Sequence, residues 1–388
     1  MEFIDLKTQQ GLLRERLDAN IRKVLAHGQY IMGPEVRALE AQLAAYVGIA
    51  HAVACASGTD ALLMALMAQG VGPGDAVFTT PFTFVATAEV IGLLGAVPVF
   101  VDIDPETYNL DPAALDRAVA AFREGDPSLH PLPRVAAGRA RAVIAVDLFG
   151  LLADYEAIGA VAKKHGLFVV EDAAQSFGAE RGGRRSCSFG DVACTSFFPA
   201  KPLGCYGDGG MCFTADDDLA AALRSLRVHG QGGDKYDNVR IGINGRLDTL
   251  QAAILLAKFE IFPEEMSRRQ EVADRYSRAL AASTRLVVPP PHREGGEGES
   301  ISAWAQYSLL ARDEAQRADL MGRLKEAGIP TAIYYPKPLH LQGAFSYLGY
   351  RRGDFPVSED VARRIFSIPM HPYLTETDQE RIVRALLG

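Results

Sequence analysis

Short apolar runs alternate with amphipathic stretches between about residues 50 and 215. Mostly apolar runs predict strands at residues 52–55, 76–79, 97–101, 142–146 and 168–170. Apolar positions recur at helical spacing between these strands, at residues 60–69, 83–94 and 155–165. A segment rich in Pro, Gly and Arg, residues 123–139, predicts a surface loop. This alternation predicts βαβ crossovers, and therefore an α/β fold whose mainly parallel sheet is covered by helices on both faces.

The pattern changes after residue 246. Residues 247–288 predict a helical region with a kink at Pro263, and residues 294–299 predict a polar, glycine-rich loop. A strand, a helix and a second strand are predicted next, at residues 304–310, 314–327 and 331–335. These elements predict a small C-terminal α/β domain at residues 263–388, beside a large domain at residues 1–262.

The amino-acid composition limits the classes of molecule that the chain is expected to bind. Of the 388 residues, 48% are hydrophobic and 23% are charged, and the formal net charge is −8. This balance is typical of a globular protein with a large core. A nucleic acid or an anionic membrane needs a basic surface, so the negative charge argues against both. A small anionic substrate needs only one local cluster of cations, and that class stays open.

The apolar runs and the cysteines bear on localisation and on metals. The runs are interrupted well short of a membrane span, and residues 1–7 lack a basic segment followed by an apolar one. We therefore expect a cytoplasmic protein without a membrane-spanning segment. The five cysteines form no CxxC pair and lie in apolar or glycine-rich strings, so we expect buried, reduced thiols and no metal site.

Asp172 follows the predicted strand at residues 168–170. Residues at the carboxyl ends of parallel strands face the ligand crevice of an open sheet, so Asp172 is a candidate for contact with a bound molecule. The alternative is a helix N-cap, because Ala173 and Ala174 can open a helix. Taken alone, Asp172 fits the N-cap better.

A turn of small residues separates the first predicted strand from an apolar helix, and it contains Ser57, Gly58 and Thr59. Free N–H groups and the helix dipole attract a phosphate to such a turn, and the hydroxyls add donors. The alternative is an ordinary Ser/Thr cap. No GxxxxGK[ST] sequence occurs and no GxGxxG follows the strand, so neither of those nucleotide-binding loops is present.

Lys201 lies between Pro199 and Pro202 in an apolar, aromatic string that continues into glycines. Burial in such surroundings disfavours the ammonium form and leaves a nucleophilic amine, which Schiff-base chemistry requires. The alternative is a lysine at the edge of a loop with its charged end in solvent.

Together the three features point to one cofactor. One α/β unit contains a phosphate cradle, a carboxylate at a strand end and a desolvated lysine. A carboxylate beside a pyridine nitrogen keeps that nitrogen protonated, so that the ring acts as an electron sink. Pyridoxal phosphate needs this set of partners, and we expect it to be bound to Lys201 as a Schiff base.

Several motifs resemble those of the DegT/DnrJ/EryC1/StrS family of fold-type-I sugar aminotransferases, and the resemblance extends along essentially the whole chain. They are residues 28–34 (GQYIMGP), 171–175 (EDAAQ), 196–201 (SFFPAK), 242–246 (GINGR) and 368–372 (IPMHP). The resemblance implies a large domain with a mainly parallel seven-stranded sheet sandwiched by helices, and a smaller C-terminal α/β domain. Aminotransferases acting on UDP-2-acetamido-2-deoxy-3-oxo-D-glucuronate are similar in more detail, at residues 3–10, 193–199 and 246–256.

The resemblance implies a role for each matching residue. Lys201 holds the cofactor and then moves the proton between substrate and cofactor, and Asp172 pairs with the ring nitrogen. Gln175 lies near the ring hydroxyl, and Phe82 stacks on the ring; an ordinary core aromatic is the alternative for Phe82. Asn244 reaches the phosphate in the neighbouring subunit, which implies a homodimer with shared active sites. The phosphate is held by Ser57, Gly58, Thr59 and Ser196.

Arg246, Tyr334 and Tyr335 mark the predicted substrate end of the site. A guanidinium suits the carboxylate of a sugar acid or of the amino donor, and an exposed structural arginine is the alternative for Arg246. Relatives tend to have His-Tyr-Pro where this chain has Tyr334, Tyr335 and Pro336. If that histidine contacts the sugar carboxylate, Tyr334 does so as a neutral donor, or the substrate differs.

The resemblance implies a two-step transamination. L-glutamate gives its amino group and leaves as 2-oxoglutarate, and a 3-keto UDP-sugar, first of all UDP-2-acetamido-2-deoxy-3-oxo-D-glucuronate, accepts it for surface-polysaccharide (lipopolysaccharide O-antigen) biosynthesis. The first alternative is another keto-sugar nucleotide, a dTDP-3-keto or a 4-keto hexose. A sugar dehydratase on the same scaffold is the second, but such enzymes have histidine at the position of Lys201. The third is a non-catalytic regulatory protein, against which Lys201, Asp172 and the phosphate cradle all argue.

Overall fold

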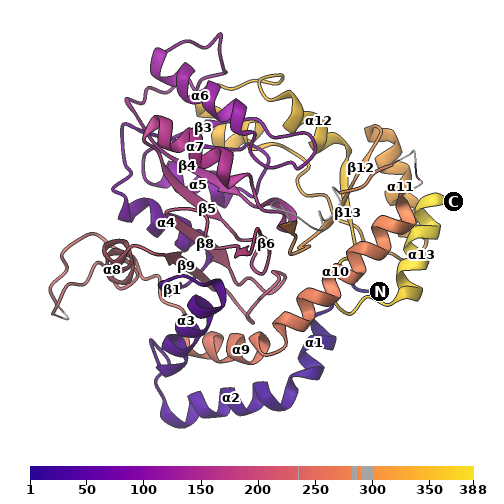
Figure 1. The fold of residues 1–388 in the computed structure, drawn as a ribbon, viewed down its shortest axis with the longest axis horizontal. Coiled ribbons are helices and arrows are strands. Elements are labelled where there is room, and N and C mark those ends of the chain that lie inside the picture. The colour runs from indigo at the N-terminus through magenta and orange to yellow at the C-terminus, as the bar shows by residue number, and fades with distance from the viewer. Residues whose placement is uncertain (235, 282, 284–285, 290–299) are drawn as a thin grey trace.

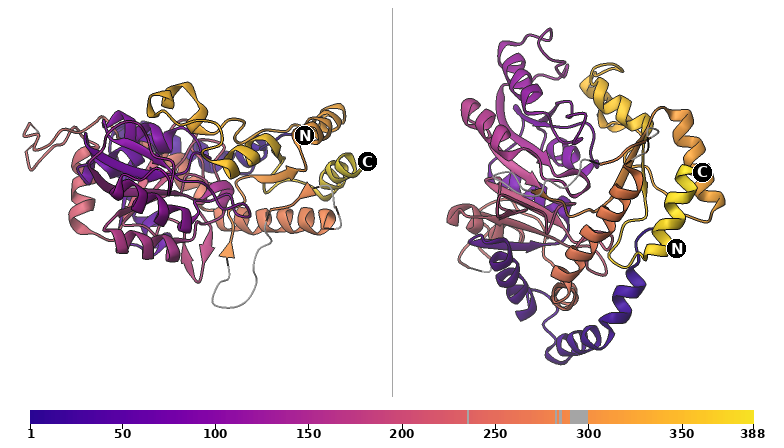
Figure 2. Two further views of the ribbon diagram at one scale, coloured as in Figure 1. Left: turned by 90° about the horizontal axis from the view of Figure 1, so that it is seen from above. Right: turned by 45° about the vertical axis from the view of Figure 1, so that its right-hand side comes forward.

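The computed structural model describes residues 1–234, 236–281, 283, 286–289 and 300–388. A larger α/β part and a smaller C-terminal part lie side by side, and the long helix α10 (Phe262–Leu280) runs between them (Figure 1). The two chain ends lie near each other beside the smaller part in every view (Figure 2). The loop predicted at residues 294–299 lies outside the described residues.

The large part is built on a seven-stranded sheet with the order β1-β9-β8-β5-β4-β2-β3. Within this sheet β9 runs antiparallel to both of its neighbours, and all other neighbouring strands are parallel. The predicted fold class is therefore confirmed. The strands are β1 (His51–Cys55), β2 (Asp75–Thr79), β3 (Val97–Phe100), β4 (Arg139–Val146), β5 (Phe168–Asp172), β8 (Val192–Ser196) and β9 (Gly210–Thr214).

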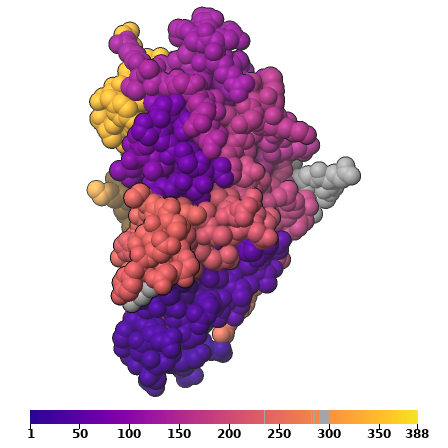
Figure 3. Space-filling model, turned by 90° about the vertical axis from the view of Figure 1, so that its left-hand side faces the viewer, coloured from indigo at the N-terminus to yellow at the C-terminus, as the bar shows by residue number. Residues whose placement is uncertain are grey.

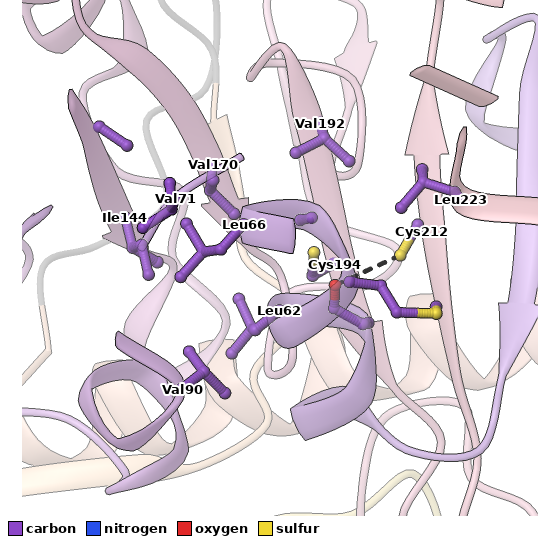
Figure 4. Packing of buried hydrophobic residues seen from close by; sticks show 14 of the residues in the cluster. Leu62, Leu66, Val71, Val90, Ile144, Val170, Val192, Cys194, Cys212 and Leu223 are labelled. Atoms are coloured by element: carbon purple, nitrogen blue, oxygen red, sulfur yellow. Dashed lines mark hydrogen bonds between the residues drawn. The ribbon is translucent and has the colours of Figure 1, made fainter. Parts of the chain in front are cut away.

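Helices cover both faces of the sheet because successive strand side chains point to opposite faces. Ile144 of β4 and Val170 of β5 pack with Leu62 of α4 on one face, in a cluster that α5 and α8 also enter (Figure 4). Their neighbours Val143 and Val169 point the other way and pack under α6 and α7. The helices of the large part are α1 (Leu6–Leu12), α2 (Arg14–His27), α3 (Pro34–Val47), α4 (Gly58–Ala68), α5 (Ala86–Leu93), α6 (Pro112–Glu124), α7 (Tyr155–His165), α8 (Asp217–Leu226) and α9 (Thr249–Phe259).

The smaller part packs helices on a three-stranded antiparallel sheet of order β10-β12-β13. A second small sheet pairs β11 (Ser300–Ile301) with the hairpin of β6 (Glu180–Arg181) and β7 (Arg184–Arg185), and so ties the two parts together. The remaining elements are β10 (Leu286–Val287), β12 (Tyr307–Ala311), α11 (Glu314–Glu326), α12 (Pro356–Arg364), β13 (Ile365–Ile368) and α13 (Glu376–Leu387).

Two predictions about the C-terminal third are wrong. Residues 247–288 form α9, α10 and the short strand β10 instead of one kinked helix. Pro263 lies in the first turn of α10, where its missing N–H and its ring prevent the helix from continuing backwards into α9. Residues 331–335 form no strand, and Ala332 makes only an isolated bridge to Ser367. Prolines on both sides of this segment remove ladder donors, which restricts its pairing.

Other predictions from the pattern are confirmed. The five predicted strands correspond to β1 to β5, and residues 125–138 of the predicted surface loop contain turns and no helix or strand. All five cysteines are buried free thiols, and Cys194 and Cys212 belong to the cluster in Figure 4. Among the described residues, every helix is too short or too polar to cross a membrane.

The division of the chain at residues 262 and 263 stays a prediction. Helix α10 begins at this point, and Phe262 packs into the core of the large part. Farther along the same helix, Val272 and Tyr276 pack into the core of the smaller part. The helix thus contributes to both cores.

Candidate active site

Most of the predicted cofactor-binding residues gather at the carboxyl edge of the sheet. Strands β1, β5 and β8 are mutually parallel through their places in the sheet, and they end just before Ser57, at Asp172 and at Ser196. Carboxyl ends of parallel strands share one edge, so segments far apart in the chain converge there. The turn that carries Lys201 follows β8 directly.

The predicted phosphate cradle consists of Ser57, Gly58 and Thr59 on one side and Ser196 on the other. Ser57 is the N-cap of α4, and its Oγ accepts a hydrogen bond from the backbone N–H of Asp60 at 3.0 Å. A Cβ on Gly58 would lie 2.7 Å from Cβ of Ser196, so the two sides can meet only because residue 58 has no side chain. The free N–H groups of a helix start then adjoin two hydroxyl residues, which fits a phosphate group.

Gly58→Ala is expected to weaken the binding of pyridoxal phosphate about 5- to 150-fold, because the added methyl group displaces Ser196 at a cost of about 1–3 kcal/mol. Titration of the apo-protein with pyridoxal phosphate measures this. Gly159→Ala in α7 is the matched control, since nothing lies within 4 Å of its added Cβ. Equal cofactor affinity in the two variants would contradict the placement of the cradle.

Asp172 ends β5, and its side chain is buried. Thr87 Oγ donates a hydrogen bond to Asp172 Oδ2 at 2.8 Å, and the backbone N–H of Ala174 donates to Oδ1 at 3.2 Å. Burial raises the pKa of Asp172, while these two donors and the charge of Lys201 lower it. Residues 174–178 form turns, so the N-cap alternative is wrong.

Sequence reasoning missed Thr87. It lies on α5, and its hydroxyl is also 3.1 Å from that of Thr83, so a short chain of hydroxyls leads to Asp172. The only signal in the sequence is the pair of threonines four residues apart in an otherwise apolar helical stretch. Such a pair is too common to identify a site.

Thr87→Val is expected to reduce kcat about tenfold and to move the acidic limb of the pH profile to higher pH. Removing the hydroxyl takes away a donor that stabilises the ionised form of Asp172, so the pKa of Asp172 rises further. Steady-state rates between pH 5 and 9 measure both effects. Thr87→Ser keeps the hydroxyl and is the control; identical profiles for the valine and serine variants would disprove this role.

Lys201 lies in the turn between β8 and β9, with its side chain partly buried. Its backbone N–H donates to the carbonyl of Phe198 at 2.9 Å, which closes the turn. Burial lowers the pKa of the Lys201 amine, and the Asp172 carboxylate partly opposes this shift. The turn therefore presents an amine of increased nucleophilicity within electrostatic reach of Asp172, as the proposed chemistry requires.

Gln175 joins the cofactor region to the smaller part. Its Oε1 accepts from the backbone N–H of Phe149 at 2.7 Å, and its Nε2 donates to the hydroxyl of Tyr335 at 3.1 Å. The ring of Phe82 is buried and meets the ring of Tyr335 edge-on, with centroids 6.2 Å apart. Tyr335, predicted at the substrate end, thus lies beside two predicted cofactor residues.

The other predicted residues lie apart from this cluster or at its margin. The carbonyl of Gly245 accepts from the backbone N–H of Ala56 at 3.0 Å, which places the segment of Asn244 and Arg246 beside the cradle. Asn244 itself is exposed. Arg246 is partly buried, and its Nε has no hydrogen-bond partner among the described residues. Tyr334 packs against Phe3, with ring centroids 6.4 Å apart.

A separate cavity of about 300 Å³ lies between the loop after β3, the turn after β4 and the start of β12. None of the predicted site residues lines it. Its walls include Tyr108, Asn109, Phe149, Trp304 and Gln306. The predicted cofactor site is therefore a different region of the same sheet edge.

Comparison with curated proteins finds relatives along the full chain. The UDP-2-acetamido-2-deoxy-3-oxo-D-glucuronate aminotransferase of Pseudomonas aeruginosa is 49% identical over 387 residues, covering 100% of this chain and 99% of that protein. A "Pleiotropic regulatory protein" of Geobacillus stearothermophilus is 43% identical over 99% of this chain and 97% of its own. The UDP-N-acetyl-3-dehydro-alpha-D-glucosamine 3-aminotransferase of Acidithiobacillus ferrooxidans is 40% identical over 99% of this chain and 96% of its own.

Solved structures agree with this result. A DegT DnrJ EryC1 StrS aminotransferase from Brucella abortus is 50% identical, with a TM-score of 0.92 over 100% of this chain and 99% of that one. NtdA from Bacillus subtilis, solved with bound cofactor PMP, is 27% identical, with a TM-score of 0.84 over 99% of this chain and 82% of that one. The family model for DegT/DnrJ/EryC1/StrS aminotransferases matches residues 12–387. Its fold, its arrangement of Lys201 and Asp172 and these matches establish that the chain belongs to the DegT/DnrJ/EryC1/StrS aminotransferase family.

Proposed function

We propose that this chain transfers the amino group of L-glutamate to C3 of UDP-2-acetamido-2-deoxy-3-oxo-D-glucuronate, with pyridoxal phosphate as its cofactor. One observation carries the proposal. Lys201, Asp172 and the cradle of Ser57 and Ser196 lie at one sheet edge, in a chain that is 49% identical over its full length to an aminotransferase named for that substrate.

Each residue at this edge of the sheet has a separate role in the proposed reaction. When bound, pyridoxal phosphate supplies an electron sink for the carbon that gains or loses the amino group. The Lys201 amine would move a proton between that carbon and the cofactor, in opposite directions in the two half-reactions, for which its lowered pKa suits it. The Asp172 carboxylate would keep the ring nitrogen protonated, and Thr87 orients that carboxylate. Ser57, Gly58, Thr59 and Ser196 would hold the phosphate.

Nitrogen and oxygen atoms balance over the two half-reactions. Glutamate gives its amino nitrogen and becomes 2-oxoglutarate, and the keto-sugar exchanges its carbonyl oxygen for that nitrogen. Both substrates carry carboxylates. The Arg246 guanidinium, whose Nε is unpaired within the described part of the chain, is the cation proposed to bind one of them. Tyr334 and Tyr335 are proposed to line the sugar end.

We also propose a homodimer in which Asn244 completes the active site of the partner subunit. Asn244 is exposed, and it belongs to an arm formed by residues 236–244. In this arm Val239 is 57% and Ile241 is 88% exposed. Exposed apolar side chains that gather on one face are typical of a contact surface. Figure 3 shows the salmon residues of this arm between the indigo N-terminal helices and the purple part of the large domain. The dimer, working in the cytoplasm, would supply amino sugars for surface polysaccharide such as O-antigen.

A matched pair of substrates tests the sugar. The UDP-3-keto uronate and the UDP-3-keto N-acetylglucosamine differ by one carboxylate, and the second is the sugar in the name of the 40% identical relative. With ¹⁵N-labelled glutamate, mass spectrometry should find label in the aminated uronate and much less in the uncharged sugar. Arg246→Gln should narrow that difference. Equal amination of both sugars, or amination of only a dTDP-linked or 4-keto sugar, would overturn the substrate.

A regulatory protein is the second candidate, and the 43% identical relative named as a regulator favours it. The two candidates differ in colour. An aminotransferase takes up pyridoxal phosphate, turns yellow and is bleached by glutamate. A protein that stays colourless with excess cofactor would support the regulator.

A further inference from the structure

A second buried lysine contacts the turn that contains Lys201. Lys258 is on α9, and only 1% of its surface is exposed. Its Nζ donates to the carbonyl of Gly204 at 2.5 Å and lies 4.7 Å from the centre of the Tyr206 ring. Lysines are almost never fully buried unless they are paired, because desolvating an ammonium group is costly.

The carbonyl that Lys258 binds belongs to the turn of Lys201. The Cys205 N–H donates to the carbonyl of Phe197 at 2.7 Å, which closes residues 198–204 into a loop. A Cβ on Gly204 would lie 2.5 Å from the carbonyl oxygen of Pro199, so the two limbs of the loop touch. A displacement of Gly204 is therefore expected to shift the other limb of the loop, and Lys201 with it.

Helix α9 holds this loop at two points. Gln251 Oε1 accepts from the backbone N–H of Tyr206 at 2.9 Å, and Gln251 Nε2 donates to the Tyr206 carbonyl at 3.3 Å. Lys258 follows Gln251 by seven residues, about two helical turns, and so points in the same direction. One face of α9 thus holds the last residue of the loop, Gly204, and the segment that follows it, at Tyr206.

The charges around Lys258 keep it an ammonium group near neutral pH. Burial lowers the pKa of Lys258 to about 8, and the negative charge of Glu265 opposes the shift. The pKa of Cys205 is raised to about 11, so that neighbour stays a neutral thiol. Glu265, on α10, accepts two hydrogen bonds from Gln9 Nε2, at 2.7 and 3.0 Å. Lys258 therefore makes a charge-assisted hydrogen bond to Gly204, stronger than one between neutral groups.

We propose that Lys258 is a positioning residue, which holds the Gly204 carbonyl and thereby sets the Lys201 amine at reacting distance from the cofactor aldehyde. The step that depends on it is the attachment of the cofactor. The Lys201 nitrogen attacks the aldehyde carbon, a carbon–nitrogen double bond forms, and the aldehyde oxygen leaves as water. The proposal rests on the proposed function only in taking Lys201 as the point of attachment.

The test separates binding from attachment, without sugar or glutamate. Apo-protein is titrated with 4′-deoxypyridoxine phosphate, which lacks the aldehyde, and is then mixed rapidly with pyridoxal phosphate while the visible absorbance is followed. Lys258→Met should bind the analogue within about twofold of the wild type but attach pyridoxal phosphate about tenfold more slowly or worse. Lys258→Arg should restore much of the rate, and Lys163→Met, an exposed lysine on α7, should change neither quantity.

Each of the other possible results contradicts one part of the proposal. An unchanged attachment rate in Lys258→Met overturns the positioning role, and a parallel loss of analogue binding means that Lys258 is merely structural. If Lys258→Met does not fold, Lys258→Gln, which keeps a donor but is shorter and neutral, is compared in the same way. A wild-type protein that binds the analogue but never develops the absorbance would overturn the proposed function instead.

Discussion

Lys201→Ala is expected to lower kcat about 10⁴-fold or more while the protein still folds and binds pyridoxal phosphate weakly. The substitution removes both the amine that attaches the cofactor and the group that moves the proton, and no other lysine lies in the turn between β8 and β9. The cradle of Ser57 and Ser196 is untouched, so the phosphate keeps its contacts.

Steady-state rates with glutamate and the keto-sugar measure the first effect. Treatment of the holoenzyme with borohydride, followed by mass spectrometry of peptides, measures attachment. The wild type should carry the reduced cofactor at Lys201, and Lys201→Ala should carry none. Lys163→Ala serves as the control for the loss of a lysine. Turnover close to that of the wild type in Lys201→Ala would refute the mechanism.

Asp172→Asn is expected to lower kcat about 10³-fold, because a neutral amide cannot hold the proton on the ring nitrogen that makes the ring an electron sink. The Thr87 hydroxyl can still reach residue 172, so the geometry should persist. Single-turnover rates with glutamate alone measure the effect on the first half-reaction. Asp218→Asn, in the exposed first turn of α8, is the control.

Asp172→Asn, although it should lower kcat, is not expected to lower the stability of the apo-protein. Burial raises the pKa of Asp172 above its value in the unfolded chain, so the folded apo-protein binds more protons than the unfolded chain between the two values. Its stability therefore falls as pH rises through that window. Asp172→Asn removes this loss, and at pH 7 the apo-variant should unfold in urea at the same concentration as the wild type or at a higher one. A lower midpoint would contradict the assignment of a buried carboxylate with a raised pKa.

Much of the large part could be predicted from the sequence, because its strands are buried on both faces and read as apolar runs. The pattern missed β8 and β9, since Ala193, Cys194 and Thr195 are small and the first residue of β9 is a glycine. The buried surroundings of Lys201 could be predicted from its apolar neighbours in the chain, whereas Asp172 taken alone fits an N-cap better, which the structure contradicts.

The remainder depends on contacts between segments that are far apart. Thr87 reaches Asp172 across 85 positions, and Lys258 reaches Gly204 across 54. No local pattern records such pairs. Residues 331–335 look like a strand in isolation, but between two prolines they form an irregular segment that brings Tyr335 to Gln175.

The antiparallel strand β9 determines when in folding the site can form. It pairs with β1 on one side and β8 on the other, so Gly210 lies opposite both Cys55 and Ser196, and the two halves of the cradle meet only after β9 has docked between them. Such a closure joins residues of large sequence separation, which is slow because the entropy of a long loop is lost first. A nascent or truncated chain without this strand has no cradle to offer. Pyridoxal phosphate is therefore expected to bind only chains in which β9 has docked. Its binding free energy then stabilises only the complete fold.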